Sequence, residues 1–203
     1  MDLTTGAIVL IFIISIFSGF GNNQGYQQPA APKFPVESSS SVKTGVSLTE
    51  PDPKYTVVDA AVTRAAIQNY IARYRSADES AAIAVSIMKY SQAYDLNPKL
   101  AAALIARESK FNPRAVSSSG AKGLGQLLPS TARGLNIDDP FDIDQNAKGT
   151  VRYIKSLIDR FNGQVSSGIA SYLEGPNAVM KNGGYTDHTR SYVEDILAIY
   201  QKI

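Results

Sequence analysis

Apolar residues recur every three or four positions over most of the chain after Tyr55. This spacing places them on one face of an α-helix. It predicts helices around residues 67–74, 80–94, 98–111, 129–135, 144–161, 165–173 and 187–200. Asp78 or Ser80 is expected to cap the second of these helices, and Asp144 the long one. No two neighbouring segments alternate as a β-hairpin would, so the pattern predicts an all-α domain.

The N-terminus carries a different pattern. Residues 7–17 are uninterruptedly apolar, and with their flanks they approach the ~20 residues that a membrane-spanning helix needs. A cleaved signal peptide is the competing interpretation, but it requires a basic start, and only the terminal amine and Asp2 stand there. We therefore expect residues 1–21 to be an uncleaved transmembrane anchor, whose orientation the flanking charges do not indicate.

Residues 22–54 are rich in Pro, Ser and Gly and carry neither helical nor strand periodicity. Such a composition predicts a flexible linker that holds the following domain away from a membrane. The chain thus divides into an anchor, a linker and a helical domain over residues 55–203.

Composition excludes several classes of chemistry. The net charge of +2 and the lack of a basic run give no case for nucleic-acid binding. The chain has no Cys, which excludes a thiolate nucleophile and disulfides. His188 is the single histidine, which argues against a His-rich metal site. We expect neither a metal nor a cofactor.

The candidate chemistry lies on the helix that begins after Asn97, a good N-cap residue. Leu100, Leu104, Glu108 and Phe111 fall on one face of this helix, so a carboxyl group in the last turn stands in line with apolar side chains. Partial burial and the negative end of the helix dipole both oppose ionisation, which predicts a raised pKa. Glu108 is therefore either a general acid or a residue that caps the solvent edge of the apolar face.

The residues after Glu108 form an ordered set of motifs. They are Glu108-Ser109, Asn112-Pro113, Ala115-Val116-Ser117, the glycine-rich run 120–126 that ends in Gln126, Pro129, and Thr131-Ala132, followed by 139–142, Asn146, Arg152-Tyr153, 171–176 and 189–193. In order and spacing this set resembles the lytic transglycosylases of the soluble-lytic-transglycosylase, goose-lysozyme-like type. The resemblance covers residues 80–203 and implies a lysozyme-like helical domain.

The resemblance implies cleavage of the β-1,4 bond between N-acetylmuramic acid and N-acetylglucosamine in peptidoglycan, with formation of a 1,6-anhydro ring. Glu108 would be the single general acid and base. Ser117, Gln126, Tyr153 and Tyr172 would line the substrate cleft, and the hydroxyl of Tyr172 would approach the catalytic carboxyl group. Each of these four also has a structural interpretation, as a turn serine, an exposed loop residue or core tyrosines.

Two departures from the family pattern leave alternatives open. Gly125 stands where the family often has Met, and Leu173-Glu174 replaces Asn-Ala. One alternative is a hydrolytic muramidase in which Glu174, Asp138 or Asp139 helps to activate water. The other is a non-catalytic module that binds peptidoglycan.

The expected partners are peptidoglycan glycan strands and, through the N-terminal segment, a membrane. The catalytic domain would lie on the peptidoglycan side, in a cell envelope or periplasm or at a virion membrane. An envelope-spanning secretion apparatus and a virion assembly are both compatible with such a tethered enzyme.

Overall fold

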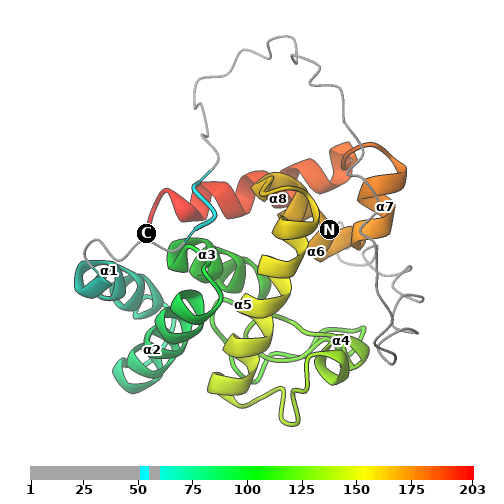
Figure 1. The fold of residues 1–203 in the computed structure, drawn as a ribbon. Helices are drawn as coiled ribbons and strands as arrows, with labels where there is room; N and C mark the ends of the chain where they lie inside the picture. Colours follow the sequence, from blue (N-terminus) through cyan, green and yellow to red (C-terminus); the bar gives the residue numbers. More distant parts are fainter. Residues whose placement is uncertain (1–50, 55–59) are drawn as a thin grey trace, which may run out of the picture.

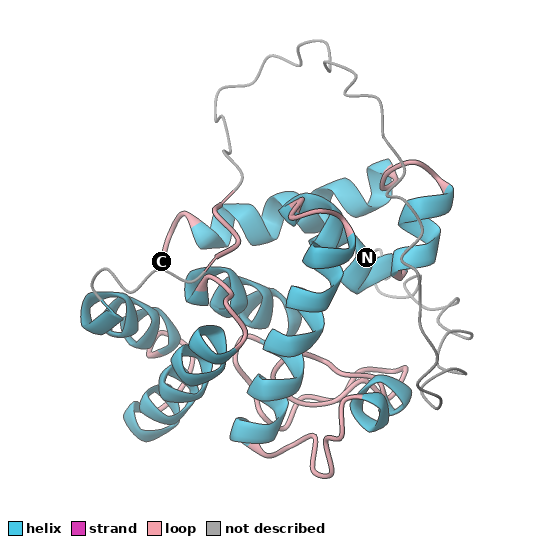
Figure 2. Cartoon of the chain, in the orientation of Figure 1, coloured by secondary structure: helices cyan, strands magenta, loops and turns pink. Residues whose placement is uncertain are grey.

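The computed structural model describes residues 51–54 and 60–203, and this part of the chain is helical, with α5 running through the middle of the molecule (Figures 1 and 2). The helices are α1 (Ala60–Ile71), α2 (Ala77–Ala93), α3 (Pro98–Ser109), α4 (Pro129–Gly134), α5 (Ile143–Arg160), α6 (Val165–Glu174), α7 (Pro176–Lys181) and α8 (Asp187–Tyr200). The described residues also form two isolated β-bridges, which pair Val116 with Lys122 and Lys122 with Leu127. The predicted all-α class is confirmed.

Two predicted N-caps are wrong by a few residues. Ser76 caps α2, its hydroxyl accepting a hydrogen bond from the Glu79 amide at 3.3 Å. Asp142 caps α5 by accepting from the Gln145 amide at 2.8 Å. The predicted cap residue, Asp144, lies instead in the first turn of α5. Its negative charge there interacts favourably with the helix dipole, but its position is past that of the N-cap.

Helix α3 is the centre of the domain. Every residue from Leu100 to Ala106 is buried, and α1, α2, α5 and α8 all contact this helix. The run of alanines on α3 lets these neighbours approach closely, because an alanine side chain adds only a methyl group to the helix surface. The sequence pattern predicted one apolar face, whereas a helix surrounded by others is buried on all sides.

Helix α5 lies between α2 and α6. Its predicted inward residues Ala147, Val151, Ile154 and Ile158 are buried, and it packs on α2 at one side and α6 at the other. Gly168 of α6 allows the close crossing, because a Cβ atom there would lie 2.4 Å from the Ile158 side chain.

At the start of α5, Asp144 bonds to three side chains of α2. It accepts hydrogen bonds from Ser86 at 3.2 Å, from Lys89 at 3.1 Å and from Tyr90. These polar contacts fasten the end of the α2–α5 interface that the apolar residues do not cover.

The predicted anchor over residues 1–21 lies outside the described residues, as does most of the predicted linker. Residues 51–54 are described, and they lie against the start of α3. There the Asn97 backbone amide donates to the Pro53 carbonyl at 2.9 Å, and the Asn97 side chain donates to the Asp52 carbonyl at 3.2 Å. Within residues 51–54 and 60–203, no helix is both long and apolar enough to span a membrane.

Candidate active site

Glu108 lies in the last turn of α3, which ends one residue later at Ser109. The chain then turns through two consecutive left-handed residues, Lys110 at φ 50° and Phe111 at φ 59°. Phe111 is fully buried against Tyr70 and Tyr74, at ring-centroid distances of 6.2 and 6.0 Å. This anchored turn ends the helix and fixes where the Glu108 side chain points.

The Glu108 carboxyl group lies between α3 and α8. The hydroxyl of Tyr192, on α8, donates a hydrogen bond to Glu108 Oε1. Burial raises the pKa of Glu108 from 4.5 to about 7, against the lowering effects of the Tyr192 hydrogen bond and the Arg107 charge. The predicted direction of this shift is confirmed, and it allows Glu108 both to give and to take a proton near neutral pH.

Arg107 supports the same corner of the site. Its guanidinium lies 5.2 Å from the centroid of the Tyr192 ring and forms an ion pair with Asp195 at 3.0 Å. Because Arg107 belongs to α3 and its two partners to α8, these contacts hold the tyrosine over the end of the acid-bearing helix.

A further tyrosine, Tyr172, lies close to the carboxyl group, and Tyr153 packs against Tyr172. The Tyr172 hydroxyl donates to the Gly125 carbonyl at 2.7 Å, and the Tyr153 ring packs on the Tyr172 ring at 5.2 Å between centroids. The pKa of Tyr172 is raised well above 10, first by burial and then by the nearby charge of Glu108. Tyr172 is thus a neighbour of the acid, but the hydroxyl bonded to the acid belongs to Tyr192.

Tyr192 was missed as a site residue in the sequence analysis. The sequence holds eleven tyrosines, and Tyr192 falls on the inward face of α8 like an ordinary core residue. Its place in the family-like segment 189–193 was the one available signal. The contact itself joins residues 84 positions apart, which no local pattern reveals.

The glycine-rich loop beside the acid is held by Asn146 of α5. Asn146 Oδ1 accepts from the Gly125 amide at 2.8 Å, and its Nδ2 donates to the carbonyls of Lys122 at 3.1 Å and Pro140 at 2.7 Å. One buried amide thereby satisfies three backbone groups of two loops. A Cβ atom at Gly125 would lie 1.9 Å from Thr150 Oγ1, so the close approach of α5 explains why this position holds glycine.

Ser117 and Gln126 belong to this loop and bond within it. Ser117 Oγ accepts from the Ala121 amide at 3.0 Å, as in the turn-serine interpretation. Gln126 has φ 49°, and its Nε2 donates to the carbonyls of Gly123 at 3.0 Å and Ala115 at 3.3 Å. Both side chains stay partly accessible at the loop surface, although their described bonds serve the loop.

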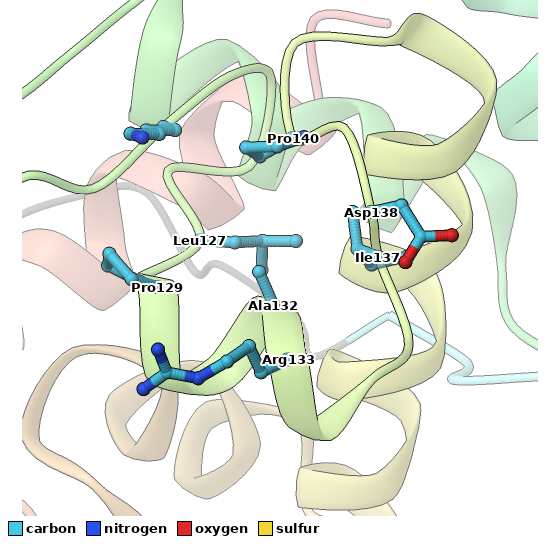
Figure 3. Close-up of a pocket in the computed structure, with 8 residues that line it drawn as sticks. Leu127, Pro129, Ala132, Arg133, Ile137, Asp138 and Pro140 are labelled. Carbon is cyan, nitrogen blue, oxygen red and sulfur yellow. The ribbon is translucent and has the colours of Figure 1, made fainter.

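The carboxylates considered for a second catalytic role have other partners or places. Glu174 accepts hydrogen bonds from the hydroxyls of Thr186 and Thr189, and Asp139 Oδ1 accepts from the Phe141 amide at 2.8 Å. Asp138 is exposed at the rim of a separate cavity of about 180 Å³, where its carboxyl group points away from Leu127 (Figure 3). Across the described residues, no cluster of His, Cys, Asp and Glu is arranged to hold a metal ion.

Together the fold and the site define an all-α domain with one half-buried carboxyl group of raised pKa at a helix end. Residues 85–194, more than half of the chain, match the family model of the transglycosylase SLT domain. The chain therefore belongs to the SLT-domain family, which confirms the resemblance found in the sequence.

Two sequence relatives and two solved structures give the extent of the likeness. A transglycosylase of Enterobacteria phage PRD1 is 38% identical over 87 residues, 43% of this chain and 32% of that protein. The membrane-bound lytic murein transglycosylase F of Vibrio cholerae is 37% identical over 78 residues, 38% of this chain and 14% of that protein. The chain thus spans about a third or less of the length of these relatives.

The structural likeness concerns the fold. The 70 kDa soluble lytic transglycosylase SLT70 of Escherichia coli has a TM-score of 0.55 at 18% identity, over 71% of this chain and 30% of that one. An inactive mutant of the lytic transglycosylase Slt of Pseudomonas aeruginosa has a TM-score of 0.51 at 24% identity, over 57% of this chain and 23% of that one.

Proposed function

We propose that this protein is a peptidoglycan lytic transglycosylase with Glu108 as its single general acid and base. The observation that carries the proposal is the Glu108 carboxyl group, half-buried at the end of α3 with a pKa of about 7. A group with that pKa is present in both protonation states near neutral pH, as one residue that first gives and then takes a proton requires.

In the proposed reaction, protonated Glu108 gives its proton to the glycosidic oxygen between N-acetylmuramic acid and N-acetylglucosamine. The bond from this oxygen to C1 of the muramic acid breaks, and the N-acetyl group of the same sugar stabilises the positive charge at C1. The Glu108 carboxylate then takes the proton of the 6-hydroxyl group of the same sugar. As this proton leaves, the oxygen of the 6-hydroxyl group bonds to C1. The product carries a 1,6-anhydro ring, and no water is consumed.

The neighbouring residues support these steps in different ways. Tyr192 donates to Glu108, which holds the carboxyl group in place and stabilises the carboxylate left by the first step. Ser117, Gln126, Tyr153 and Tyr172 are proposed to form the walls of the glycan cleft. Support for this comes from Tyr172, whose hydrogen bond to Gly125 joins α6 to the loop that carries the first two residues.

The test uses the purified full chain and purified sacculi, with released muropeptides weighed by mass spectrometry. We expect products that lack one water relative to hydrolysis, and loss of these products in Glu108→Gln. Glu194→Gln, the same chemical change at an exposed position of α8, is the matched control and should act as wild type. Products with reducing ends would instead indicate a hydrolytic muramidase. Binding to sacculi without any release would indicate a binding module.

We also propose that residues 1–21 anchor the enzyme in a membrane, with residues 22–54 as a tether and the domain on the peptidoglycan side. Support comes from the apolar run 7–17 and from relatives that are named membrane-bound. The phage relative favours a virion membrane as one setting, beside an envelope-spanning apparatus. Fractionation of the full chain and of a variant without residues 1–21 tests this proposal: release of both into the soluble fraction would refute it.

A further inference from the structure

Glu174, the last residue of α6, is bonded to the start of α8. The Thr186 hydroxyl donates to Glu174 Oε1 at 2.9 Å, and the Thr189 hydroxyl donates to the same oxygen. Thr186 is also the N-cap of α8, because its hydroxyl accepts from the Thr189 amide at 3.4 Å. One carboxylate oxygen at the end of α6 therefore binds both the N-cap residue and a first-turn residue of α8.

These bonds fasten the part of α8 that apolar packing leaves uncovered. The buried apolar residues of this helix, Val193, Ile196 and Leu197, all follow Thr189, whereas Asp187, His188 and Arg190 are exposed. Thr189 is itself fully buried, so its hydroxyl needs a partner inside the protein. A carboxylate at this place also favours the positive end of the α8 dipole.

The tyrosine of the proposed site follows on the next turn of α8. Thr189 and Tyr192 are three residues apart on one face of α8, and the Tyr192 hydroxyl donates to Glu108. On the other side of the junction, α6 carries Tyr172, which is bonded to the glycine-rich loop. Glu174 thus sets the position of α8, which carries Tyr192, relative to α6, which carries Tyr172.

We propose that Glu174 is a positioning residue: by holding the first turn of α8 onto α6, it keeps the Tyr192 hydroxyl on Glu108. The inference rests on the proposed role of Glu108 as acid and base. It also assigns a use to the carboxylate that departs from the family pattern, in place of activating water.

The proposal predicts which changes at Glu174 are tolerated. Both hydroxyls bond to Oε1, so Glu174→Gln keeps the acceptor and should retain activity within about twofold. Glu174→Ala removes it, and Thr189→Val removes one donor at nearly equal volume. Because small misplacements of a reacting group cost much of its rate, we expect both to lower kcat about tenfold. Glu194→Ala, on the exposed side of α8, is the matched control and should not change kcat.

A pH profile distinguishes positioning from a general loss of stability. The charged and titratable groups described around Glu108 are Arg107 on α3, Tyr192 on α8 and Tyr172 on α6. The Tyr192 hydrogen bond lowers the pKa of Glu108, so loosening it raises that pKa above about 7. Glu174→Ala and Tyr192→Phe should both move the basic limb of kcat/KM to higher pH, by about one unit. Combining the two changes should add little.

Titration of the Glu108 carboxyl carbon by NMR gives a readout that does not depend on turnover. The signal is assigned by its absence in Glu108→Gln, and the same shift of about one pH unit is expected in Glu174→Ala and Thr189→Val. An inactive wild type would refute the proposed function but leave this test in force.

Three results would overturn the inference. The first is a folded Glu174→Ala in which Glu108 titrates as in wild type. If Glu174→Ala does not fold, a wild-type titration in Thr189→Val is the second. The third is a combination of two observations: Glu174→Gln is as inactive as Glu174→Ala, and the wild-type products carry reducing ends. Together these would make Glu174 the base that activates water.

Discussion

Replacing Glu108 with Gln should stabilise the folded protein at alkaline pH while abolishing activity. The folded-state pKa of Glu108 is about 7, against 4.5 for the free side chain. Because the folded-state value is the higher one, the contribution of Glu108 to stability is fully present below pH 4.5 and is lost as the pH rises through about 7. Each pKa unit corresponds to about 1.4 kcal/mol, so the loss amounts to about 3 kcal/mol.

The assay is urea unfolding of the full chain, followed by circular dichroism from pH 5 to pH 9. Glutamine is neutral, has nearly the same shape and offers Oε1 to the Tyr192 hydroxyl, so the two proteins differ mainly in the charge of residue 108. The variant should exceed wild type by less than about 1 kcal/mol at pH 5 and by about 3 kcal/mol at pH 9. Comparing the two at each pH cancels the titration of all other groups.

A difference that stays constant from pH 5 to pH 9 would refute the reasoning, because it would mean that Glu108 titrates alike in the folded and unfolded states. Glu194→Gln, the same chemical change at an exposed position of α8, is the matched control. A confirmed result would show that the acid is kept at a cost in stability, as is common for groups whose pKa is tuned for catalysis.

Three further predictions concern residues near Glu108 and the contact between α2 and α5, each measured by urea unfolding. Gly125→Ala places a methyl group 1.9 Å from Thr150 Oγ1 and should destabilise by about 3 kcal/mol, whereas Gly120→Ala, strained at φ 78° but in open space, should cost about 1 kcal/mol; equal losses would contradict the steric argument. Tyr172→Phe leaves the Gly125 carbonyl without its donor and should cost about 1–3 kcal/mol; an unchanged midpoint would count against this bond. Burial raises the pKa of Asp144, but hydrogen bonds from α2 outweigh burial and lower this pKa, so the stability that Asp144 contributes is lost as the pH falls. Asp144→Asn should therefore destabilise the protein at pH 7 and less so at pH 3. An equal loss at both pH values would disprove the link between the pKa of Asp144 and stability.

Local chemistry accounts for what the sequence predicted well. Periodicity placed the long helices, since a buried face repeats every three or four residues whatever it packs against. It missed α7, whose six residues are too few to show a period. It also misplaced the caps of α2 and α5, because Ser and Asp at neighbouring positions offer the same acceptor and only the backbone geometry selects one of them.

By itself the sequence determined that Glu108 stands at the end of an apolar helix and that the motifs after it follow the SLT pattern. Both are properties of neighbours along the chain. Tertiary structure alone decided that Tyr192 and not Tyr172 bonds to the acid, that Asn146 holds the glycine-rich loop, and that Glu174 meets the start of α8. These contacts join residues 84, 21 and 12 positions apart. Their partners are chosen by how the helices cross, which no local spacing of residues encodes.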